Sequence, residues 1–543
     1  MTLSIKNKNA VYRAIDFTQI LILVGIFVYY FVENFVLSGS WEILALRSVD
    51  DAAMQGAVHN IHKAMTEGRY PLNKLLATFD YAYGNAYWLL TSILLFPFYL
   101  IGDAQAQIVA GRQISLLFVA GSIYVMGRIV EKLYPESRRL KYPLMIAMAT
   151  APMVAVIATK LHVNAPCIFW GVLSFYYLVR RPDFIRKDMM WSAVFAGVAV
   201  GFKLTAVFIL PVIGLTLLSQ IWRFSPLRKI TEIAIFSGLF LVVAAASMFP
   251  PLLLFPFYGD KISEAYKAFL MFRDLAAIGG NSDLFLKLIN TLGYFLSPLT
   301  LAVLSFLFLM LILDDIRKRR FVSSFIFGTI LLTLGYLVLT VQKDATYVAS
   351  YMLSVSLFLP LGLLGVAAFR APESIKLTVL YLIVVSGLIC MTPHQKSVFD
   401  YFNFFALAKS EKATNQMAAL EEIRSLVSPL KLPVRVLQDC ESVFPATMYT
   451  DGVFIGYIFG DLKDKTTWGD FDYILLSRKH YIGKPPAPLV IDKKTPLEKL
   501  SGTELEEAIR QRLYDKGDYY GRKYRLIYDR YDSLLYQLVK PAK

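Results

Sequence analysis

Apolar stretches long enough to cross a lipid bilayer recur along this chain from about residue 16 to about residue 392. Because lipid offers no water to the backbone N–H and C=O groups, such stretches fold as α-helices that satisfy those groups internally. The composition agrees: 56% of the 543 residues are hydrophobic and 18% are charged, whereas about a quarter of residues in soluble domains are charged. The sequence therefore predicts a polytopic α-helical membrane protein.

A change in composition near residue 396 divides the chain. We predict a membrane domain over 1–395 and a soluble domain over 396–543, which at about 145 residues is a normal domain size. The second part contains short runs typical of strands and one stretch typical of a helix, which together predict a small α/β domain. The strand-like runs are Val434–Gln438, Tyr473–Ser477, Tyr524–Tyr528 and Leu534–Val539, and the helical stretch is Glu504–Tyr514.

Twelve apolar segments are present, and the basic residues between them indicate how they thread through the membrane. The segments are 16–36, 84–102, 108–130, 142–160, 163–179, 189–202, 204–221, 230–256, 287–313, 321–341, 345–369 and 373–392. Short loops rich in Lys and Arg stay in the cytoplasm. If 84–102 does not cross, five basic clusters fall on the same side as the N-terminus; these lie at 128–141, 180–187, 223–229, 317–320 and 370–376.

The charge pattern therefore favours about eleven spans, with 84–102 lying at the interface as a juxtamembrane helix. The N-terminus is then cytoplasmic, while the first outer loop (37–107) and the soluble domain lie outside. The alternative is that 84–102 is an ordinary span and the charge rule fails. The net charge of +15 follows from this topology and requires no nucleic acid partner.

Several chemistries have no signature in the sequence. It contains no glycine-rich phosphate loop, no HExxH and no paired CxxC. The three cysteines have no metal-ligand spacing and imply no disulfide framework. The predicted inner loops are too short to form a nucleotide-binding domain. If the chain uses a sugar donor, we therefore expect a membrane lipid, and not a nucleotide, to carry it.

An acidic pair, Asp50-Asp51, follows the first apolar segment on the predicted outer side. A carboxylate there could remove the proton of an acceptor hydroxyl during glycosyl transfer. The pair could instead hold a divalent cation through its oxygens. A third interpretation is structural, because acidic residues stabilise the first turn of a helix, here over 51–67.

Polar residues gather where the predicted spans reach the outer face. They are Arg112, His162, Asn164, Lys203 and Lys343. One carboxylate facing several cations suits a reaction in which an anionic phosphate leaves, since Lys and Arg stabilise the charge that develops. Snorkelling of Lys and Arg toward lipid headgroups is the alternative for each cation taken alone.

Aromatic residues crowd the stretch around Gly84, including Tyr83 and Tyr87. They could stack on a sugar or form an interfacial aromatic belt. The outer loop at 257–286 carries Arg273 and a Gly279-Gly280 pair. It could close over a bound lipid or serve only as a connector.

These motifs, in this order, resemble the GT-C superfamily of polyprenyl-phosphate-sugar-dependent glycosyltransferases. The closest resemblance is to family 39, which includes protein O-mannosyltransferases and the aminoarabinose transferases of lipid A. The resemblance covers about 17–370 and depends on the order of weak motifs. They are Asp50-Asp51, Tyr83-Gly84-Asn85-Ala86-Tyr87-Trp88-Leu89-Leu90, Gly102 to Ser115, Ala196-Gly197 to Lys203, and Ser350-Tyr351 with Pro360.

The resemblance implies roles for some of these residues. Asp50, with Asp51 beside it, would be the base, and Arg112, Lys203 and more weakly Lys343 would contact the donor phosphate. Tyr83, Tyr87, His162, Asn164, Arg273 and Tyr351 would be further substrate contacts. Asn164 stands where the family carries a second acidic residue, which leaves the role of a divalent cation open.

The leading hypothesis is an inverting glycosyltransferase of a bacterial inner membrane. Its donor would be a polyprenyl-phosphate sugar, and its acceptor a glycan, a lipid or a protein. The competing hypothesis is a transporter or flippase of a lipid-linked glycan. Such proteins usually have internal repeats and ionisable residues at mid-membrane depth, whereas here we find no convincing repeat and the ionisable residues lie at span ends.

Overall fold

The structure is a computed structural model with two compact units. The first comprises Met1–Val36 and Ile61–Phe402, and the second comprises Leu37–Asn60 and Asn403–Lys543. The residues that the structure describes are 5–36, 49–68, 84–133, 139–151, 154, 157–181, 183–250, 263, 372–389, 411–427, 431, 433–438, 444–445, 453–457, 471–477, 508, 511–513, 515–519, 522–531 and 533–539.

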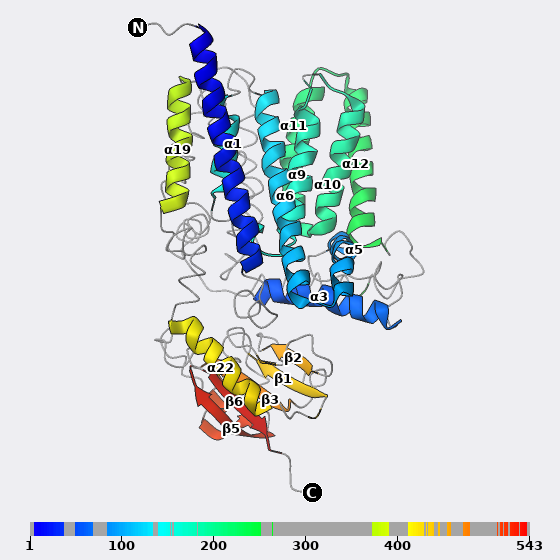
Figure 1. The fold of residues 1–543 in the computed structure, drawn as a ribbon. Coiled ribbons are helices and arrows are strands. Elements are labelled where there is room, and N and C mark those ends of the chain that lie inside the picture. The colour runs from blue at the N-terminus through cyan, green and yellow to red at the C-terminus, as the bar shows by residue number, and fades with distance from the viewer. Residues whose placement is uncertain are drawn as a thin grey trace. The chain divides into compact units, whose positions relative to one another are not determined.

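The first unit is a bundle of apolar helices, several of which run alongside one another (Figure 1). Their bounds are α1 (Ile5–Val36), α5 (Asn85–Ile101), α6 (Ala104–Leu133), α7 (Lys141–Ala149), α9 (Asn164–Val179), α10 (Arg186–Phe202), η2 (Leu204–Ile209), α11 (Leu210–Ile221), α12 (Pro226–Met248) and α19 (Glu373–Ile389). Helix α3 (Val49–Thr66) begins in the second unit and ends in the first.

Three helices of the described chain are long and apolar enough to cross a membrane. These stretches are Ala14–Phe35, Gln105–Lys132 and Pro226–Met248. Large apolar side chains on α1 and α12, such as Phe17 and Leu241, are exposed, as expected for surfaces that face lipid. The predicted spans 287–313, 321–341 and 345–369 lie outside the described residues, so the predicted number of spans stays a prediction.

Two predicted segments differ from the helices observed. The stretch 142–160 does not form one continuous helix, because α7 ends at Ala149 and a turn follows at Thr150. The run 204–221 begins as a 3₁₀ helix before α11, since Lys203 takes an extended backbone conformation that interrupts the helical path. The predicted runs at 108–130 and 163–179 correspond to α6 and α9.

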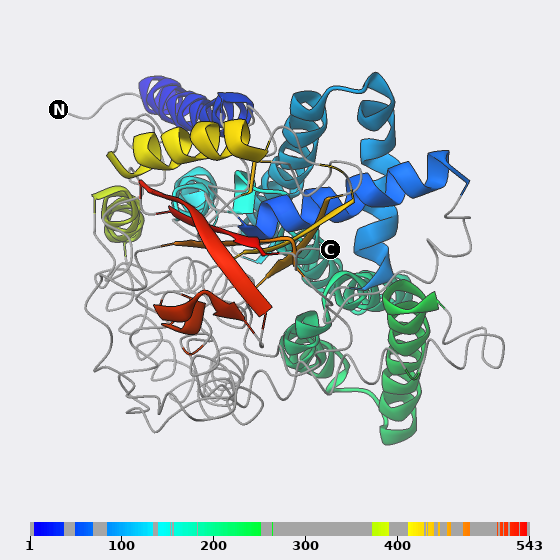
Figure 2. The ribbon, with the colours of Figure 1, turned by 90° about the horizontal axis from the view of Figure 1, so that it is seen from below.

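Helix α5 lies across the direction of its neighbours. Figure 1 shows it nearly end-on, and the quarter-turned view of Figure 2 shows it along its length. Pro97 lies inside α5 without ending it, and the helix stops at Gly102, whose φ of 77° suits glycine. His62 of α3 fixes one side of α5, since its Nε2 lies 2.8 Å from the Ser92 carbonyl oxygen. This orientation favours the interpretation of 84–102 as a juxtamembrane helix.

Helices α10 and α12 pack closely because small residues face each other. A Cβ on Gly201 would lie 2.1 Å from the Ser247 Cβ, and one on Gly197 would lie 2.9 Å from the Val243 Cβ. Glycines four residues apart allow helix backbones to approach within a membrane. This close approach lies at the end of α10, directly before Lys203.

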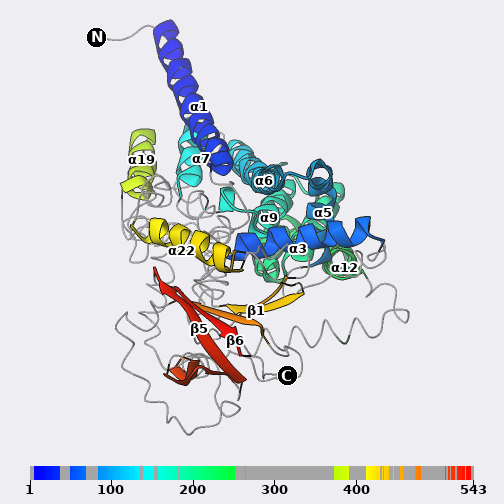
Figure 3. The ribbon, with the colours of Figure 1, turned by 60° about the horizontal axis from the view of Figure 1, so that its bottom comes forward.

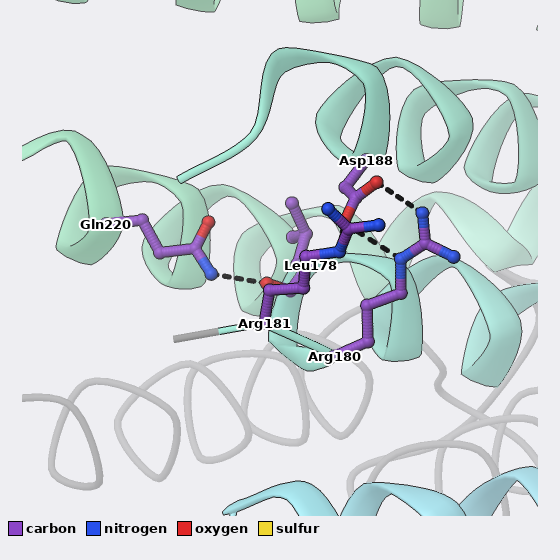
Figure 4. Close-up of polar contacts among 5 residues, drawn as sticks. All are labelled: Leu178, Arg180, Arg181, Asp188 and Gln220. Atoms are coloured by element: carbon purple, nitrogen blue, oxygen red, sulfur yellow. Dashed lines mark hydrogen bonds and ion pairs between the residues drawn. The ribbon is translucent and has the colours of Figure 1, made fainter. Parts of the chain in front are cut away.

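Ion pairs fasten one end of the bundle, which we call the basic end: the C-terminus of α9 and the N-termini of α10 and α12. Arg180 Nε donates to Asp188 Oδ2 at 2.8 Å, and Arg181 approaches the same carboxylate (Figure 4). Arg186 Nε donates to Glu232 Oε2 at 3.0 Å. Both carboxylates are buried, so each ion pair compensates a charge that would otherwise be costly to bury.

The second unit contains a six-stranded mixed sheet with the order β2-β1-β3-β6-β5-β4. Figure 3 labels three of these strands, β1, β5 and β6. Strand β1 runs parallel to both β2 and β3, and β6 runs antiparallel to β3 and β5. The bounds are α22 (Glu411–Val427), β1 (Val434–Gln438), β2 (Val453–Tyr457), β3 (Tyr473–Ser477), β4 (Asp518–Tyr519), β5 (Arg522–Arg530) and β6 (Ser533–Leu538).

Both faces of this sheet are buried. Helix α22 packs one face through Ala419 and Ile423, which join a cluster with Val436 and Leu535. The other face gathers Leu437, Ile474 and Tyr536 with Ala508 and Leu513 from a helical segment. The predicted α/β composition is confirmed, and β1 and β3 have the predicted bounds. The sequence analysis missed β2, β4 and α22.

Candidate active site

Lys203 is a buried cation at the end of α10. Its side chain is 1% exposed, and its Nζ donates to Asn164 Oδ1 at 3.1 Å. The backbone there is extended (φ −152°, ψ 126°), which carries the side chain out of the helical path. Burying an ammonium group is costly unless other groups compensate its charge. The amide oxygen of Asn164 accepts one of its three hydrogens.

Asn164 and His162 lie together at the start of α9. Asn164 is fully buried, and its backbone N–H donates to His162 Nδ1 at 3.1 Å. An Nδ1 that accepts a hydrogen bond implies a neutral ring with its proton on Nε2. Burial and the charges of Lys203 and Lys160 lower the pKa of His162 well below its ordinary value, which agrees with the neutral form.

Arg112 lies on α6, where its side chain is 2% exposed. Ser115 lies one helical turn further along the same face, and its Oγ accepts a hydrogen bond from the His162 backbone N–H at 3.2 Å. A chain of contacts thus runs from Lys203 through Asn164 and His162 to the Arg112 face of α6. We call this group the site end of the bundle.

The aromatic motif meets the same end. The Gly84 backbone N–H donates to the Phe202 carbonyl oxygen at 3.1 Å, directly before Lys203. A Cβ on Gly84 would lie 2.1 Å from the Gly201 carbonyl oxygen, so only glycine fits there. Tyr87 and Trp88 in the first turn of α5 are buried. The start of α5 is therefore seated on the end of α10.

The remaining predicted site residues are Asp50, Asp51, Tyr83, Arg273, Lys343 and Tyr351. Asp50 and Asp51 are the second and third residues of α3, in the part of that helix that belongs to the second unit. Their position agrees with the helix-start interpretation and leaves the base role a prediction. Tyr83, Arg273, Lys343 and Tyr351 lie outside the described residues.

Three polar residues that the sequence analysis did not select make contacts between the helices of the bundle. Ser115 lies three residues after Arg112, so helical spacing could have identified it. Asn34 at the end of α1 donates to the Ala158 carbonyl oxygen at 3.1 Å, and Gln113 Nε2 donates to the Phe31 carbonyl oxygen at 3.0 Å. The first contact joins α1 to the segment before His162, and the second joins α6 to α1. No local sequence pattern predicts either contact.

Among the described residues, acidic and histidine side chains form no metal-binding cluster at the site end. Within the described part of the chain, no group of three His, Cys, Asp or Glu residues could hold a metal ion. A divalent cation at Asp50-Asp51 therefore stays a prediction from the sequence.

Solved structures share this architecture. ArnT from Cupriavidus metallidurans in its apo state superposes with a TM-score of 0.50 and 12% identity over 89% of this chain and 92% of that one. The same protein bound to undecaprenyl phosphate gives a TM-score of 0.53 and 11% identity over 95% and 97%. This chain shares the ArnT fold. The predicted GT-C resemblance is confirmed at the level of the fold, and the chain is a multi-pass membrane protein.

Comparisons by sequence give no relative. No protein-family model matches the chain, and no curated protein matches it. At 11–12% identity the ArnT likeness concerns the fold alone. The chemistry must therefore be argued from the residues of the site end.

Proposed function

We propose that this chain is an integral-membrane glycosyltransferase that moves a sugar from a polyprenyl-phosphate-linked donor to an acceptor outside the cytoplasm. The observation that carries the proposal is the buried Lys203 ammonium beside the neutral amide of Asn164. An anionic phosphate is the ligand that such a group stabilises most strongly in a site of low polarity. An ArnT structure with the same fold contains a ligand of this class, undecaprenyl phosphate.

The proposed reaction is an inverting displacement. The Asp50 carboxylate takes the proton of an acceptor hydroxyl, and the hydroxyl oxygen forms a bond to the anomeric carbon of the sugar. The bond between that carbon and the phosphate oxygen breaks, and its electron pair leaves with polyprenyl phosphate. Lys203 and Arg112 stabilise the negative charge that grows on the phosphate.

The topology belongs to the same proposal. The site end, with α5 lying across it, faces the outside of an inner membrane, while the basic end faces the cytoplasm. About eleven spans place the N-terminus inside and the soluble α/β domain outside. Tyr83, Tyr87, Arg273, Lys343 and Tyr351 would add substrate contacts. The acceptor would be a glycan, a lipid or a protein.

Substitution of the acidic pair tests the chemistry. We expect Asp50→Asn with Asp51→Asn to lower the rate of sugar transfer by about 100-fold or more, since general-base catalysis contributes that much. Full-length protein in lipid nanodiscs would be given a panel of undecaprenyl-phosphate sugars, and the release of undecaprenyl phosphate would be measured.

Asp103→Asn is the matched control, because Asp103 is an exposed carboxylate whose Oδ1 accepts the Gln105 N–H at the start of α6. That variant should transfer sugar at the wild-type rate. Full activity in the Asp50/Asp51 variant would contradict the base assignment. Movement of the intact lipid-linked sugar across the membrane, without release of undecaprenyl phosphate, would support the flippase hypothesis instead.

A further inference from the structure

The oxygen and the nitrogen of the Asn164 side-chain amide differ in their hydrogen bonding. Its Oδ1 accepts from Lys203 Nζ, and this contact fixes which end of the amide is oxygen, because an ammonium group can only donate. The Nδ2 group on the other end has no hydrogen-bond acceptor among the residues that the structure describes, although Asn164 is fully buried. Buried donors without acceptors are rare, and each one requires an explanation.

The groups around this amide supply donors and positive charge. Lys203 approaches it from the end of α10. Lys160 lies near enough to His162 for its charge to lower the pKa of that ring. The His162 ring accepts the Asn164 backbone N–H at Nδ1, so its own proton is on Nε2 and it is a donor on that side. An anionic acceptor would satisfy the unused N–H, and both cations attract such a ligand.

We propose that Asn164 is a phosphate-binding residue whose Nδ2 donates to an unesterified oxygen of the lipid phosphate that Lys203 neutralises. The inference rests on the proposed function and adds to it a donor that is neutral. When the bond between the anomeric carbon and the phosphate oxygen breaks, the electron pair passes to the phosphate, and its charge goes from −1 to −2. A donor already aimed at that phosphate then binds more strongly in the transition state than in the ground state.

A double-mutant comparison distinguishes this role from a structural one. An Asp at position 164 would keep the shape, convert the contact with Lys203 into an ion pair, and replace the N–H donor by an anionic oxygen that repels phosphate. Asn164→Asp therefore weakens phosphate binding under either role, and Asn164→Leu in a Lys203→Met background separates the two. If Asn164 only holds Lys203 in place, Asn164→Leu has no further effect once Lys203 is Met. If Asn164 binds phosphate, the substitution weakens binding in that background as well.

The test measures binding by the full-length protein in nanodiscs of zwitterionic lipid. The three probes are undecaprenyl phosphate, undecaprenol and inorganic phosphate, and thermal unfolding reports whether each variant is folded. We expect Asn164→Asp to weaken undecaprenyl phosphate binding by about 10- to 100-fold, the range for hydrogen bonds to charged groups. Undecaprenol binding should not change, and inorganic phosphate should bind more weakly than the lipid phosphate.

Asn164→Leu and Asn34→Leu form a matched pair. Both remove a fully buried amide, but the Nδ2 of Asn34 already donates to the Ala158 carbonyl oxygen. Asn164→Leu should therefore weaken phosphate binding, and Asn34→Leu should lower only the unfolding temperature. If Asn164→Asp does not fold, Asn164→Leu decides the question in its place.

Wild-type affinity for undecaprenyl phosphate in the folded Asn164 variants would overturn the inference, while sugar transfer by the wild-type protein would leave the proposed function standing. Conversely, phosphate binding that depends on Asn164 in a protein that transfers no sugar would overturn the proposed function alone. Equal affinity for inorganic phosphate and the lipid phosphate would overturn the assignment of a lipid source.

Discussion

At the scale of single residues, the charge of the site end is set by which side chains accompany Lys203. Its Nζ donates to the amide oxygen of Asn164, and the neighbouring His162 ring is neutral. Neither of these two groups repels an anionic ligand, which the ammonium attracts. The burial of Lys203 and Arg112 strengthens this attraction, because charges interact more strongly where water is excluded.

His162 provides a pH-dependent prediction at this scale. Its folded-state pKa lies well below the ordinary value of 6.5, so below pH 6.5 the unfolded chain binds a proton that the folded chain does not. Above pH 6.5 the ring is neutral in both states, and burying it causes no loss of stability. Below pH 6.5 the free energy of unfolding decreases by about 1.4 kcal/mol for each pH unit. We expect His162→Gln to reduce this loss, measured by thermal unfolding between pH 7.5 and 5. Equal acid sensitivity in both proteins would disprove the assignment.

At the scale of elements, the contact between α10 and α12 positions the site. Gly197 and Gly201 allow the backbones to approach, and Gly84 seats α5 on the same point. Lys203 follows this contact directly, so the geometry of the cation depends on the fit of three helices. The ion pairs of Asp188 and Glu232 hold the other ends of α9, α10 and α12.

We expect Gly201→Ala to destabilise the protein by about 1–3 kcal/mol, because its Cβ would overlap the Ser247 side chain and force the two helices apart. Gly214→Ala on α11 is the matched control, since nothing lies within 4 Å of its added Cβ. That variant should be neutral or slightly stabilised, because alanine favours helix. Denaturant unfolding in detergent would compare the two, and similar stability would show that the close approach does not matter.

At the scale of the whole molecule, the helices carry the cationic site and the ion pairs at opposite ends of the bundle. Helix α10 begins at Arg186, which pairs with Glu232, and ends directly before Lys203. Helix α9 begins at Asn164 and ends directly before Arg180. A helix of this length separates the two groups by most of a bilayer. Since the basic end matches the predicted cytoplasmic loops, the site end is expected to face outward.

Cysteine labelling tests this sidedness. Asp103→Cys near the site end and Arg228→Cys at the basic end would be introduced into a cysteine-free background, since both side chains are exposed. We expect a membrane-impermeant maleimide to label Asp103→Cys in intact spheroplasts and Arg228→Cys only after permeabilisation. Labelling of both positions from the same side would contradict the topology.

The sequence alone predicted an α-helical membrane protein, the positions of α1, α6, α9 and α12, and the bounds of two strands of the sheet in the second unit. These features depend on apolar length, charge and local periodicity, which are properties of neighbouring residues. The order of short motifs also selected Arg112, Lys203, His162 and Asn164 as candidates.

Only the tertiary structure decided which of these candidates meet. Lys203 reaches Asn164 across 39 residues of chain, and His162 reaches Ser115 across 47. Whether such contacts form depends on how closely helices pack, and therefore on glycines such as Gly201 whose effect is invisible in a hydropathy pattern. The orientation of α5 across the bundle follows from the same packing, because a 17-residue apolar helix could equally well span or lie flat.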